Sequence, residues 1–226
     1  MCGRYAIRVD AETLAQRFHL TAPELPLPDD LAGPRYNVAP TQRMAIVVRD
    51  AEGAHARPMR WGLVPRWAKD PSGGAKMINA RSETLIEKPT FRPLVRTRRC
   101  VVPASGFYEW DRATRTPYFI HLKGEPVLGF AGLYDIWSGP DGTVMPTYTI
   151  ITTAANETIA PIHDRMPAIL RPEDEDDWLD PANTKPEEVL PLLRPYAPTD
   201  IALYKVSRDV NSPRNDREDL LLPLGA

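Results

Sequence analysis

The sequence predicts an α+β fold of mixed, mostly antiparallel strands with short flanking helices. Strand-like segments outnumber helical ones along the 226 residues, and the two kinds do not alternate regularly, which disfavours a doubly wound parallel sheet. The 25 prolines favour short elements joined by ordered loops over long helices. Because no internal repeat and no biased linker divides the chain, we expect a single domain over residues 1–226.

In the first half of the chain, strands are predicted where apolar and polar residues alternate or where β-branched residues gather. These strands cover residues 5–9, 44–49 and 57–63. Asp10 is a favourable N-cap type and predicts a helix over 11–18. Four prolines predict an ordered surface loop over 21–34, and a second short helix is expected near 82–87.

The second half continues with more strands than helices. Its predicted strands cover residues 100–103, 106–110, 118–122, 127–133, 144–153 and 201–206. Helices are predicted over 172–179 and 186–193, because each segment opens with Pro followed by Glu. A helical turn is expected at 156–162, and residues 211–226 form a polar tail that is expected to wrap the surface.

Composition indicates a soluble globular protein. Hydrophobic residues make up 42 % of the chain and charged residues 26 %. No apolar run approaches the roughly 18 residues that span a membrane. Arg4, Arg8 and Asp10 interrupt any signal-peptide core. We therefore expect a cytoplasmic protein without a membrane partner, associated with the nucleoid if it is bacterial.

Cysteine and histidine usage argues against disulfides and metals. The two cysteines, Cys2 and Cys100, do not make a disulfide framework, which fits a reducing compartment. The four histidines and two cysteines lack the spacing of a zinc site, so we expect no metal and no cofactor. Cys100 lies in an apolar segment and is expected to be an inert buried thiol.

Charge is distributed unevenly, although the formal net charge is only −2. Residues 35–99 contain 14 Lys/Arg and 5 Asp/Glu, a local charge of +9, whereas residues 171–226 contain 7 and 13, a local charge of −6. The basic stretch also carries Trp61, Trp67 and Phe91. Cationic groups mixed with aromatic rings suit single-stranded nucleic acid. The alternative is an ordinary solvated surface of mixed charge.

Cys2 carries unusual chemistry for its position. Its small side chain favours removal of Met1, which would leave a free α-amine beside the thiol on one residue. The ordinary pKa is about 7.7–8.0 for the amine and about 8.5 for the thiol, so both groups are expected to be partly reactive near neutrality. Such a pair attacks an aldehyde twice, first forming an imine and then closing a thiazolidine. A chance cysteine after methionine is the alternative.

Six short blocks in this order resemble the signature of the SRAP family, the SOS response-associated peptidases. They are residues 1–5 (MCGRY), 37–41 (NVAPT), 61–65 (WGLVP), 79–83 (NARSE), 106–110 (GFYEW) and 163–167 (HDRMP). Val206-Ser207 and Val210-Asn211 are similar to a further C-terminal block. The resemblance implies a pseudo-barrel fold and activity on abasic sites in single-stranded DNA, with a monomeric protein as our expectation.

The resemblance implies four catalytic residues. Cys2 would form the covalent thiazolidine cross-link to the ring-opened sugar. Glu109 lies among aromatic residues, which favours a part-buried carboxyl that would move protons. His163 would act on the sugar ring oxygen or assist release, and Asn79 would bind the nucleophile or a sugar hydroxyl. Structural roles are the alternative for these last three residues.

The resemblance also implies a set of DNA-binding residues: Arg4, Asn37, Pro40, Trp61, Trp67, Arg81 and Arg165. The three arginines are phosphate candidates, because a guanidinium offers a planar fork of donors. The two tryptophans and the proline would stack on bases or wedge between them. Core packing is the alternative for both tryptophans.

Three other functions stay open at this point. A peptidase of the N-terminal-nucleophile type would use the same Cys2, carboxylate and histidine, and could remove Met1 by self-processing. It would need an oxyanion hole, which the sequence does not identify. A non-catalytic binder of single strands would explain the basic stretch but not Cys2, Glu109 and His163. A reader of modified bases in duplex DNA is the third. Lyase cleavage through the imine would accompany cross-linking.

Overall fold

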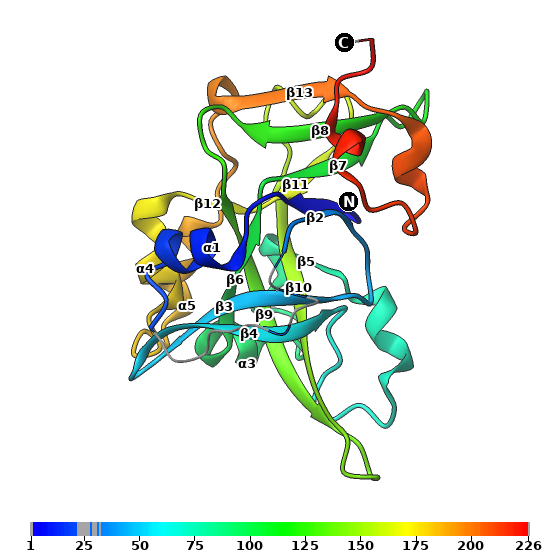
Figure 1. Cartoon of the computed structure of the whole chain (residues 1–226). Helices are drawn as coiled ribbons and strands as arrows, with labels where there is room; N and C mark the ends of the chain where they lie inside the picture. Colours follow the sequence, from blue (N-terminus) through cyan, green and yellow to red (C-terminus); the bar gives the residue numbers. More distant parts are fainter. Residues whose placement is uncertain (1, 22–27, 29–30, 32, 226) are drawn as a thin grey trace.

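The computed structural model describes residues 2–21, 28, 31 and 33–225. Within these residues, two sheets form the centre of the molecule (Figure 1). The strands of the smaller sheet are, in spatial order, β13 (Ile201–Lys205), β8 (Pro117–Leu122), β7 (Gly106–Trp110), β1 (Tyr5–Ile7) and β2 (Arg35–Val38). Each neighbouring pair in this sheet is antiparallel.

The larger sheet contains the longest strands. Its path runs through β11 (Arg165–Pro167), β10 (Val144–Ala154), β4 (Gly53–Trp61), β3 (Arg43–Asp50), β6 (Arg99–Ala104), β9 (Leu128–Ser138) and β12 (Ile169–Leu170), with β5 (Asn79–Arg81) on β10. β4 and β5 pair with β10 in parallel, and β9 pairs with β10 antiparallel. The mixed but mostly antiparallel sheets confirm the predicted α+β class.

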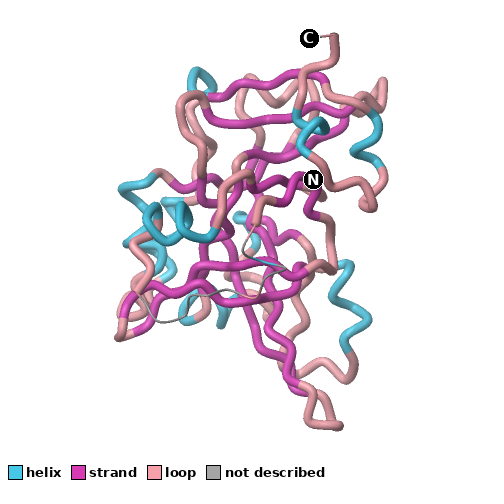
Figure 2. Tube along the Cα trace, in the orientation of Figure 1, coloured by secondary structure: helices cyan, strands magenta, loops and turns pink. Residues whose placement is uncertain are grey.

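Short helices lie at the periphery of the strands, as Figure 2 shows. The α-helices are α1 (Ala11–Arg17), α3 (Arg92–Thr97), α4 (Pro172–Leu179) and α5 (Pro186–Val189). The 3-10 turns are η1 (Pro71–Lys76), η2 (Ser82–Thr84), η3 (Leu190–Leu192), η4 (Pro198–Asp200), η5 (Arg208–Asn211) and η6 (Glu218–Leu221). Asp10 caps α1 as predicted, because its carboxylate accepts the Thr13 amide at 2.9 Å. No helix in the described part of the chain has the length and apolar character to cross a membrane.

Several predicted elements differ from the observed ones. The helix expected near 82–87 is only η2, the segment 156–162 forms turns, and 186–193 divides into α5 and η3. The sequence analysis missed short elements: β2, β5, β11, β12 and α3. They have too few residues for a periodic pattern, and pairing or packing with distant segments holds them. Most of the loop predicted over 21–34 lies outside the described residues.

The main core joins the two sheets through a cluster of aromatic rings. Tyr5 of β1 meets Trp61 of β4 edge-on with 5.2 Å between ring centroids, and Trp61 stacks on Tyr148 of β10 at 6.3 Å. The Tyr5 and Tyr148 hydroxyls share a hydrogen bond of 2.8 Å, so the buried polar atoms are satisfied. Cys2 belongs to this same buried cluster. The core therefore fixes the position of the N-terminal segment.

The C-terminal tail wraps the surface, as predicted, and hydrogen bonds from the buried Asn37 side chain anchor it. The Asn37 side chain is fully buried, and its amide donates to the carbonyls of Val210, Ser212 and Asn215 at 3.2, 3.0 and 2.6 Å. The Asp216 carboxylate in turn accepts the Asn37 backbone amide at 3.1 Å. A second apolar cluster lies beneath the tail and consists of Ala6, Tyr108, Phe119, Val206, Val210, Leu220 and Leu221.

Replacing Asn37 with Ala is expected to destabilise the protein by roughly 2–3 kcal/mol, because several tail carbonyls lose their donor. Urea unfolding measures this, and limited proteolysis should show earlier cleavage between residues 206 and 225. Asn183→Ala is the control, since Asn183 accepts one local amide bond, from Lys185, and should cost about 0.5 kcal/mol. Equal stability of the two variants would contradict the assigned role of Asn37.

Candidate active site around Cys2

Cys2 lies three residues before the start of β1 at Tyr5 and is fully buried. The side-chain amide of Asn79 donates to the Cys2 carbonyl at 2.8 Å. Asn79 begins β5, whose pairing with β10 brings a segment 77 residues away to the N-terminus. In the described part of the chain, the buried Asn79 Oδ1 has no hydrogen-bond partner. Asn79 thus orients the Cys2 backbone and presents an acceptor at the site.

Glu109 reaches the same place through β7. This strand pairs with β1, and the Tyr108 amide donates to the Arg4 carbonyl at 2.9 Å. The Glu109 side chain is buried, and its Oε1 accepts the Trp110 amide at 3.4 Å. Burial raises the pKa of the Cys2 thiol, and the Glu109 charge raises it further. This corrects the expectation of a partly ionised thiol, which assumed a solvated cysteine.

His163 lies in a turn with only 11 % of its side chain exposed. Its Nδ1 accepts the Arg165 backbone amide at 3.0 Å and also lies 3.1 Å from the Asp164 carboxylate. Its Nε2 lies 3.2 Å from Arg112 Nη2, and Arg112 also pairs with Asp164. Burial lowers the pKa of His163, whereas Glu109 raises it and Arg112 lowers it.

The four predicted catalytic residues come from four separate segments. The Glu109 charge raises the pKa of both the Cys2 thiol and the His163 ring. Asn79 contacts Cys2 directly. The sequence analysis missed Arg112 and Asp164 as partners of His163. Asp164 is adjacent in sequence, but no local pattern links Arg112 to a residue 51 positions away.

Two of the predicted DNA-binding residues occupy interior positions. Arg4 Nη1 donates to Asn37 Oδ1 and to the Val210 carbonyl, each at 2.7 Å, and its guanidinium lies 6.0 Å from the Trp110 ring. Asn37 is fully buried beneath the tail. Direct DNA contact by Asn37 would require the tail to leave, so the structure gives it an internal tethering role instead.

The two tryptophans lie in opposite environments. Trp61 is fully buried, and its Nε1 donates to the Ile78 carbonyl at 3.0 Å, so the core-packing alternative applies to it and base stacking does not. Trp67 is 70 % exposed. Its loop is anchored on both sides, because Asp135 accepts the Arg66 amide at 2.8 Å and Trp137 Nε1 donates to the Ala68 carbonyl at 2.8 Å. A rigid loop thus presents an exposed aromatic ring.

The remaining predicted DNA-binding residues lie on β5, β11 and the turn before β3. Arg81 is exposed and forms no ion pair with another described residue. Pro40 is half-buried in a turn closed by the Gln42 amide on the Ala39 carbonyl at 3.2 Å. Thr41 in this turn has a φ of 74°, a strained value for a β-branched residue. The turn is therefore held in shape by its surroundings.

Arg165 already has a carboxylate partner. Its guanidinium forms a two-pronged pair with Glu83 at 2.6 and 2.9 Å and donates to the Thr152 carbonyl at 2.6 Å. This pairing lowers the pKa of Glu83. The sequence analysis did not identify Glu83 as this partner, although both residues fall within the family-like blocks. A phosphate at Arg165 would compete with Glu83 or bind beside it.

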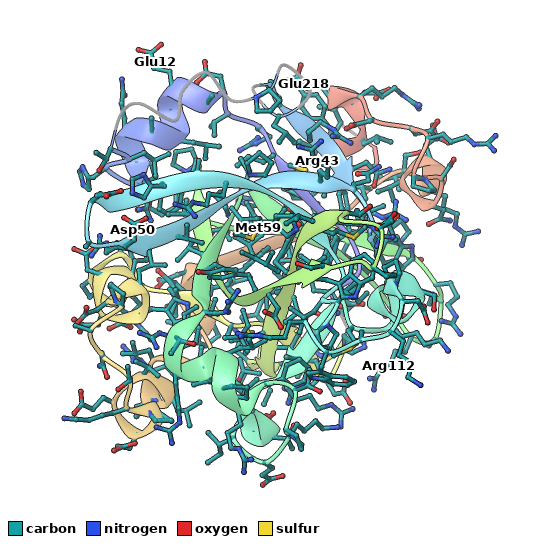
Figure 3. The ribbon with its side chains drawn as sticks, turned by 90° about the horizontal axis from the view of Figure 1, so that it is seen from below. Glu12, Arg43, Asp50, Met59, Arg112 and Glu218 are labelled. Carbon is teal, nitrogen blue, oxygen red and sulfur yellow. The ribbon has the colours of Figure 1, made fainter. Side chains whose placement is uncertain are left out.

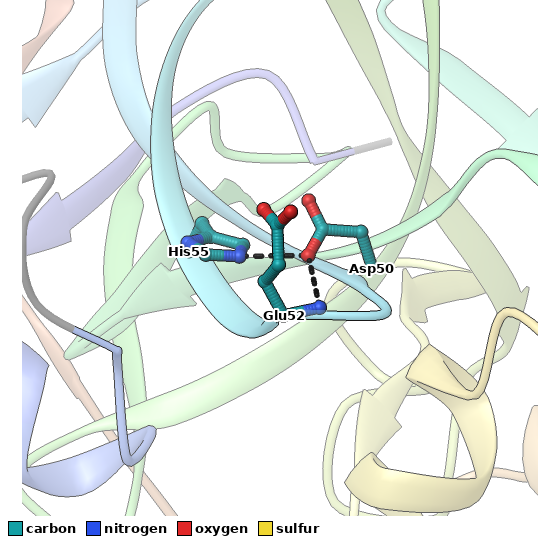
Figure 4. A group of neighbouring side chains, drawn as sticks. All are labelled: Asp50, Glu52 and His55. Atoms are coloured by element: carbon teal, nitrogen blue, oxygen red, sulfur yellow. Dashed lines mark hydrogen bonds and ion pairs between the residues drawn. The ribbon is translucent and has the colours of Figure 1, made fainter.

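One cluster in the described chain has the residue types of a metal site. Donor atoms of Asp50, Glu52 and His55 lie within 4.8 Å of one another at the β3–β4 turn (Figure 4). Asp50 Oδ1 accepts the Glu52 amide at 3.0 Å and lies 2.8 Å from His55 Nε2, and Asp50 Oδ2 pairs with Arg57 at 3.2 Å. These contacts account for the cluster as a turn network, and we assign no metal to it.

Comparison with known proteins places this geometry in a family. The family model described as SOS response associated peptidase (SRAP) matches residues 1–213. The chain is 44 % identical to "Abasic site processing protein YoqW" of Bacillus subtilis (strain 168), covering 98 % of this chain and 99 % of that protein. It is 36 % identical to "Abasic site processing protein HMCES" of Gallus gallus, covering 99 % of this chain and 78 % of that protein.

The fold has a solved counterpart. A crystal structure of a protein from Bacteroides thetaiotaomicron superposes with a TM-score of 0.89 at 30 % sequence identity, covering 99 % of this chain and 100 % of that one. Its similarity extends over both sheets and the C-terminal tail, given that coverage. The sequence blocks, the fold and the family match agree, and the chain belongs to the SOS response associated peptidase (SRAP) family.

Proposed function

We propose that this protein processes abasic sites in single-stranded DNA by forming a covalent cross-link through Cys2 after Met1 is removed. The observation that carries the proposal is the hydrogen bond from the Asn79 amide to the Cys2 carbonyl, together with a Glu109 charge that raises the pKa of both the Cys2 thiol and the His163 ring. The names of the relatives, abasic site processing proteins, support the substrate. We further propose that it acts as a monomer in the cytoplasm, as one domain, without a cofactor.

The chemistry joins one aldehyde to one amino-thiol. The ring-opened sugar presents an aldehyde at C1′, and the Cys2 amine adds to it and expels water to give an imine. The Cys2 S–H then adds across the C=N bond, with sulfur bonding to carbon and the proton passing to nitrogen. The product is a thiazolidine, and water is the sole by-product. β-Elimination from the imine would give lyase cleavage of the strand.

Glu109 is the proton acceptor in this scheme. Because burial and the Glu109 charge raise the pKa of the Cys2 thiol, the thiol stays protonated near neutrality and needs a base when it attacks. In the earlier imine-forming step, the same carboxylate can take a proton from the adding amine and give it to the hydroxyl that leaves as water; in the later step it can pass the thiol proton to the imine nitrogen. The peptidase alternative would need an oxyanion hole as well as this base, and Met1 removal by self-processing stays open.

His163 is the second acid–base group, and its neighbours bear on which ring nitrogen holds the proton. The Arg112 guanidinium can only donate hydrogen bonds, so its contact requires His163 Nε2 to be the acceptor. The ring proton is then on Nδ1 and faces Asp164. The Arg165 amide can also only donate, and it requires Nδ1 to accept. One neutral ring cannot satisfy both donors. We propose that Arg112 leaves Nε2 when DNA binds, so that Nε2–H faces the sugar oxygen.

The DNA path is proposed from the exposed residues near this site. The exposed Trp67 ring would stack on a base, and Pro40 would wedge between bases. Arg81 would supply a cation for a phosphate. Arg165 and Arg4 would bind DNA nearer the sugar. Within the protein, Arg165 is hydrogen-bonded to Glu83 and Arg4 to Asn37. A non-covalent binder of single strands would need only these surface groups, which leaves the buried Cys2 and Glu109 without a purpose.

Mixing the purified protein with an oligonucleotide that carries one abasic site should give a heat-stable band of reduced mobility on a denaturing gel. Cys2→Ala should abolish this band, because it removes the sulfur that closes the ring. Cys100→Ala should retain it, since Cys100 is buried on β6. Absence of the band with wild-type protein whose N-terminus is verified as Cys2 would refute the proposal.

Glu109→Gln keeps the size of the side chain but removes the base. Cross-linking should slow by roughly 10²- to 10⁴-fold, while binding to an oligonucleotide with a non-reactive abasic analogue should change little. Single-turnover gel assays and fluorescence anisotropy measure the two quantities. Glu188→Gln is the matched control, because the Glu188 carboxylate pairs with Lys185 on the protein surface and has no part in the proposed site. An unchanged rate in Glu109→Gln would remove the assigned role.

The pKa of His163 should respond in opposite directions to its two charged neighbours. Arg112 lowers it, so Arg112→Gln should raise it, whereas Asp164 raises it, so Asp164→Asn should lower it. ¹⁵N NMR of the imidazole nitrogens measures both the pKa and the tautomer. Arg115→Gln on the same turn is the control and should leave the spectrum unchanged. Insensitivity of the His163 signals to both variants would contradict the proposed contacts.

A further inference from the structure

A hollow of about 480 Å³ opens beside the β3–β4 hairpin, at the start of β10. Its lining combines cationic and apolar side chains: Arg43, Pro58, Arg60, Val144, Met145 and Pro146. Figure 3 labels Arg43 beside the pale blue β3–β4 ribbon. The volume falls within the range of about 300–1,000 Å³ that is common for ligand sites. None of these residues belongs to the cross-linking site described above.

Two like charges face each other in this groove. Arg43 and Arg60 are direct partners in the antiparallel β3–β4 ladder, and like charges in that position destabilise a sheet. Other arginines of the same hairpin form ion pairs: Arg49 pairs with Asp176, and Arg57 pairs with Asp50. Among the described residues, no acid pairs with Arg43 or Arg60. The arrangement leaves two cations free to share an anion.

The rest of the groove is apolar and accessible. Val144 is 63 % exposed, an unusual environment for a large aliphatic side chain. The Met145 sulfur lies 3.8 Å from Arg60 Nη1, so an apolar and a cationic side chain are in contact in the groove. A nucleotide has both complementary parts, a phosphate for the guanidinium groups and a flat base for the aliphatic and proline surface.

The groove adjoins the proposed DNA path. Arg60 Nε donates to the Thr41 carbonyl at 3.3 Å, which links the groove to the turn that holds Pro40. On β10, Thr147 is the partner of Arg60 and Ile150 is the partner of Asn79. Three residues of a strand span roughly 10 Å. About three nucleotides, at roughly 3.4 Å each when stacked, cover this distance.

We propose that this groove binds the single strand of DNA on one side of the abasic site, with a phosphate between Arg43 and Arg60 and a base against Val144 and Pro146. The inference rests on the proposed function, because the strand is the one that carries the lesion. It adds a binding subsite that sets how much flanking DNA the protein requires and on which side.

Oligonucleotides with a tetrahydrofuran abasic analogue, which cannot cross-link, test the subsite. One should cover the lesion alone, and two should extend it on the 5′ or the 3′ side. The double variant Arg43→Gln/Arg60→Gln should weaken binding of one extended oligonucleotide by about tenfold and reduce its salt slope by about 0.7, because the contact to one shared phosphate is lost. Arg92→Gln/Arg96→Gln on α3 removes the same charge and should change neither.

Cross-linking to the short oligonucleotide separates this inference from the proposed function. The groove variant should cross-link the short aldehyde substrate at the wild-type rate, and Arg43→Gln alone should unfold no earlier than wild type, because a like-charge contact is lost. Wild-type binding of both extended oligonucleotides by the groove variant overturns the subsite. So does an equal loss with the short oligonucleotide. Failure of wild type to cross-link refutes the proposed function instead.

Discussion

The pairing of β1 with β7 is the constraint on which the chemistry of this chain depends. Tyr5 lies opposite Phe107 in this antiparallel ladder, so Cys2, three residues before Tyr5, and Glu109, two residues after Phe107, fall at the same end. Tyr5 then anchors β1 into the aromatic core through Trp61 and Tyr148. The segment that carries Cys2 therefore leads into a sheet, and Glu109 lies on β7 of the same sheet, where backbone hydrogen bonds rather than a loop hold it.

Glu109 connects the two halves of the site. Its charge raises the pKa of the Cys2 thiol and of the His163 ring, so both groups hold their protons more firmly while Glu109 is ionised. The Arg112 charge lowers the pKa of His163 and so opposes the effect of Glu109 on this ring. In the proposed mechanism, proton transfer to Glu109 would relax both effects together, which would couple the Cys2 thiol to the His163 ring. A mutation at any one of these positions should therefore not be additive with a mutation at another.

Cys2, Asn79, Glu109 and His163 could be predicted as site candidates because each lies in a distinctive block, and the structure shows Asn79 bound to the Cys2 carbonyl; their catalytic roles stay predictions. The predicted DNA contacts separate into exposed and buried residues, which a block cannot indicate. Trp61 and Trp67 illustrate this: one fills the core and the other is exposed on an anchored loop. Long-range partners such as Arg112 were missed because they depend on tertiary contacts with no local signature.

Ion pairs in the structure neutralise part of the uneven charge that the sequence shows. Acids of the C-terminal region neutralise arginines elsewhere, as Asp216 does for Arg35 and Asp176 for Arg49. Asp135 similarly engages Arg66 and Arg98. The local charge of residues 35–99 therefore overstates the cationic surface. Among the described residues, no acid pairs with Arg43, Arg60 or Arg81, which lie on β3, β4 and β5, so these three arginines keep their charge available for DNA along the proposed path.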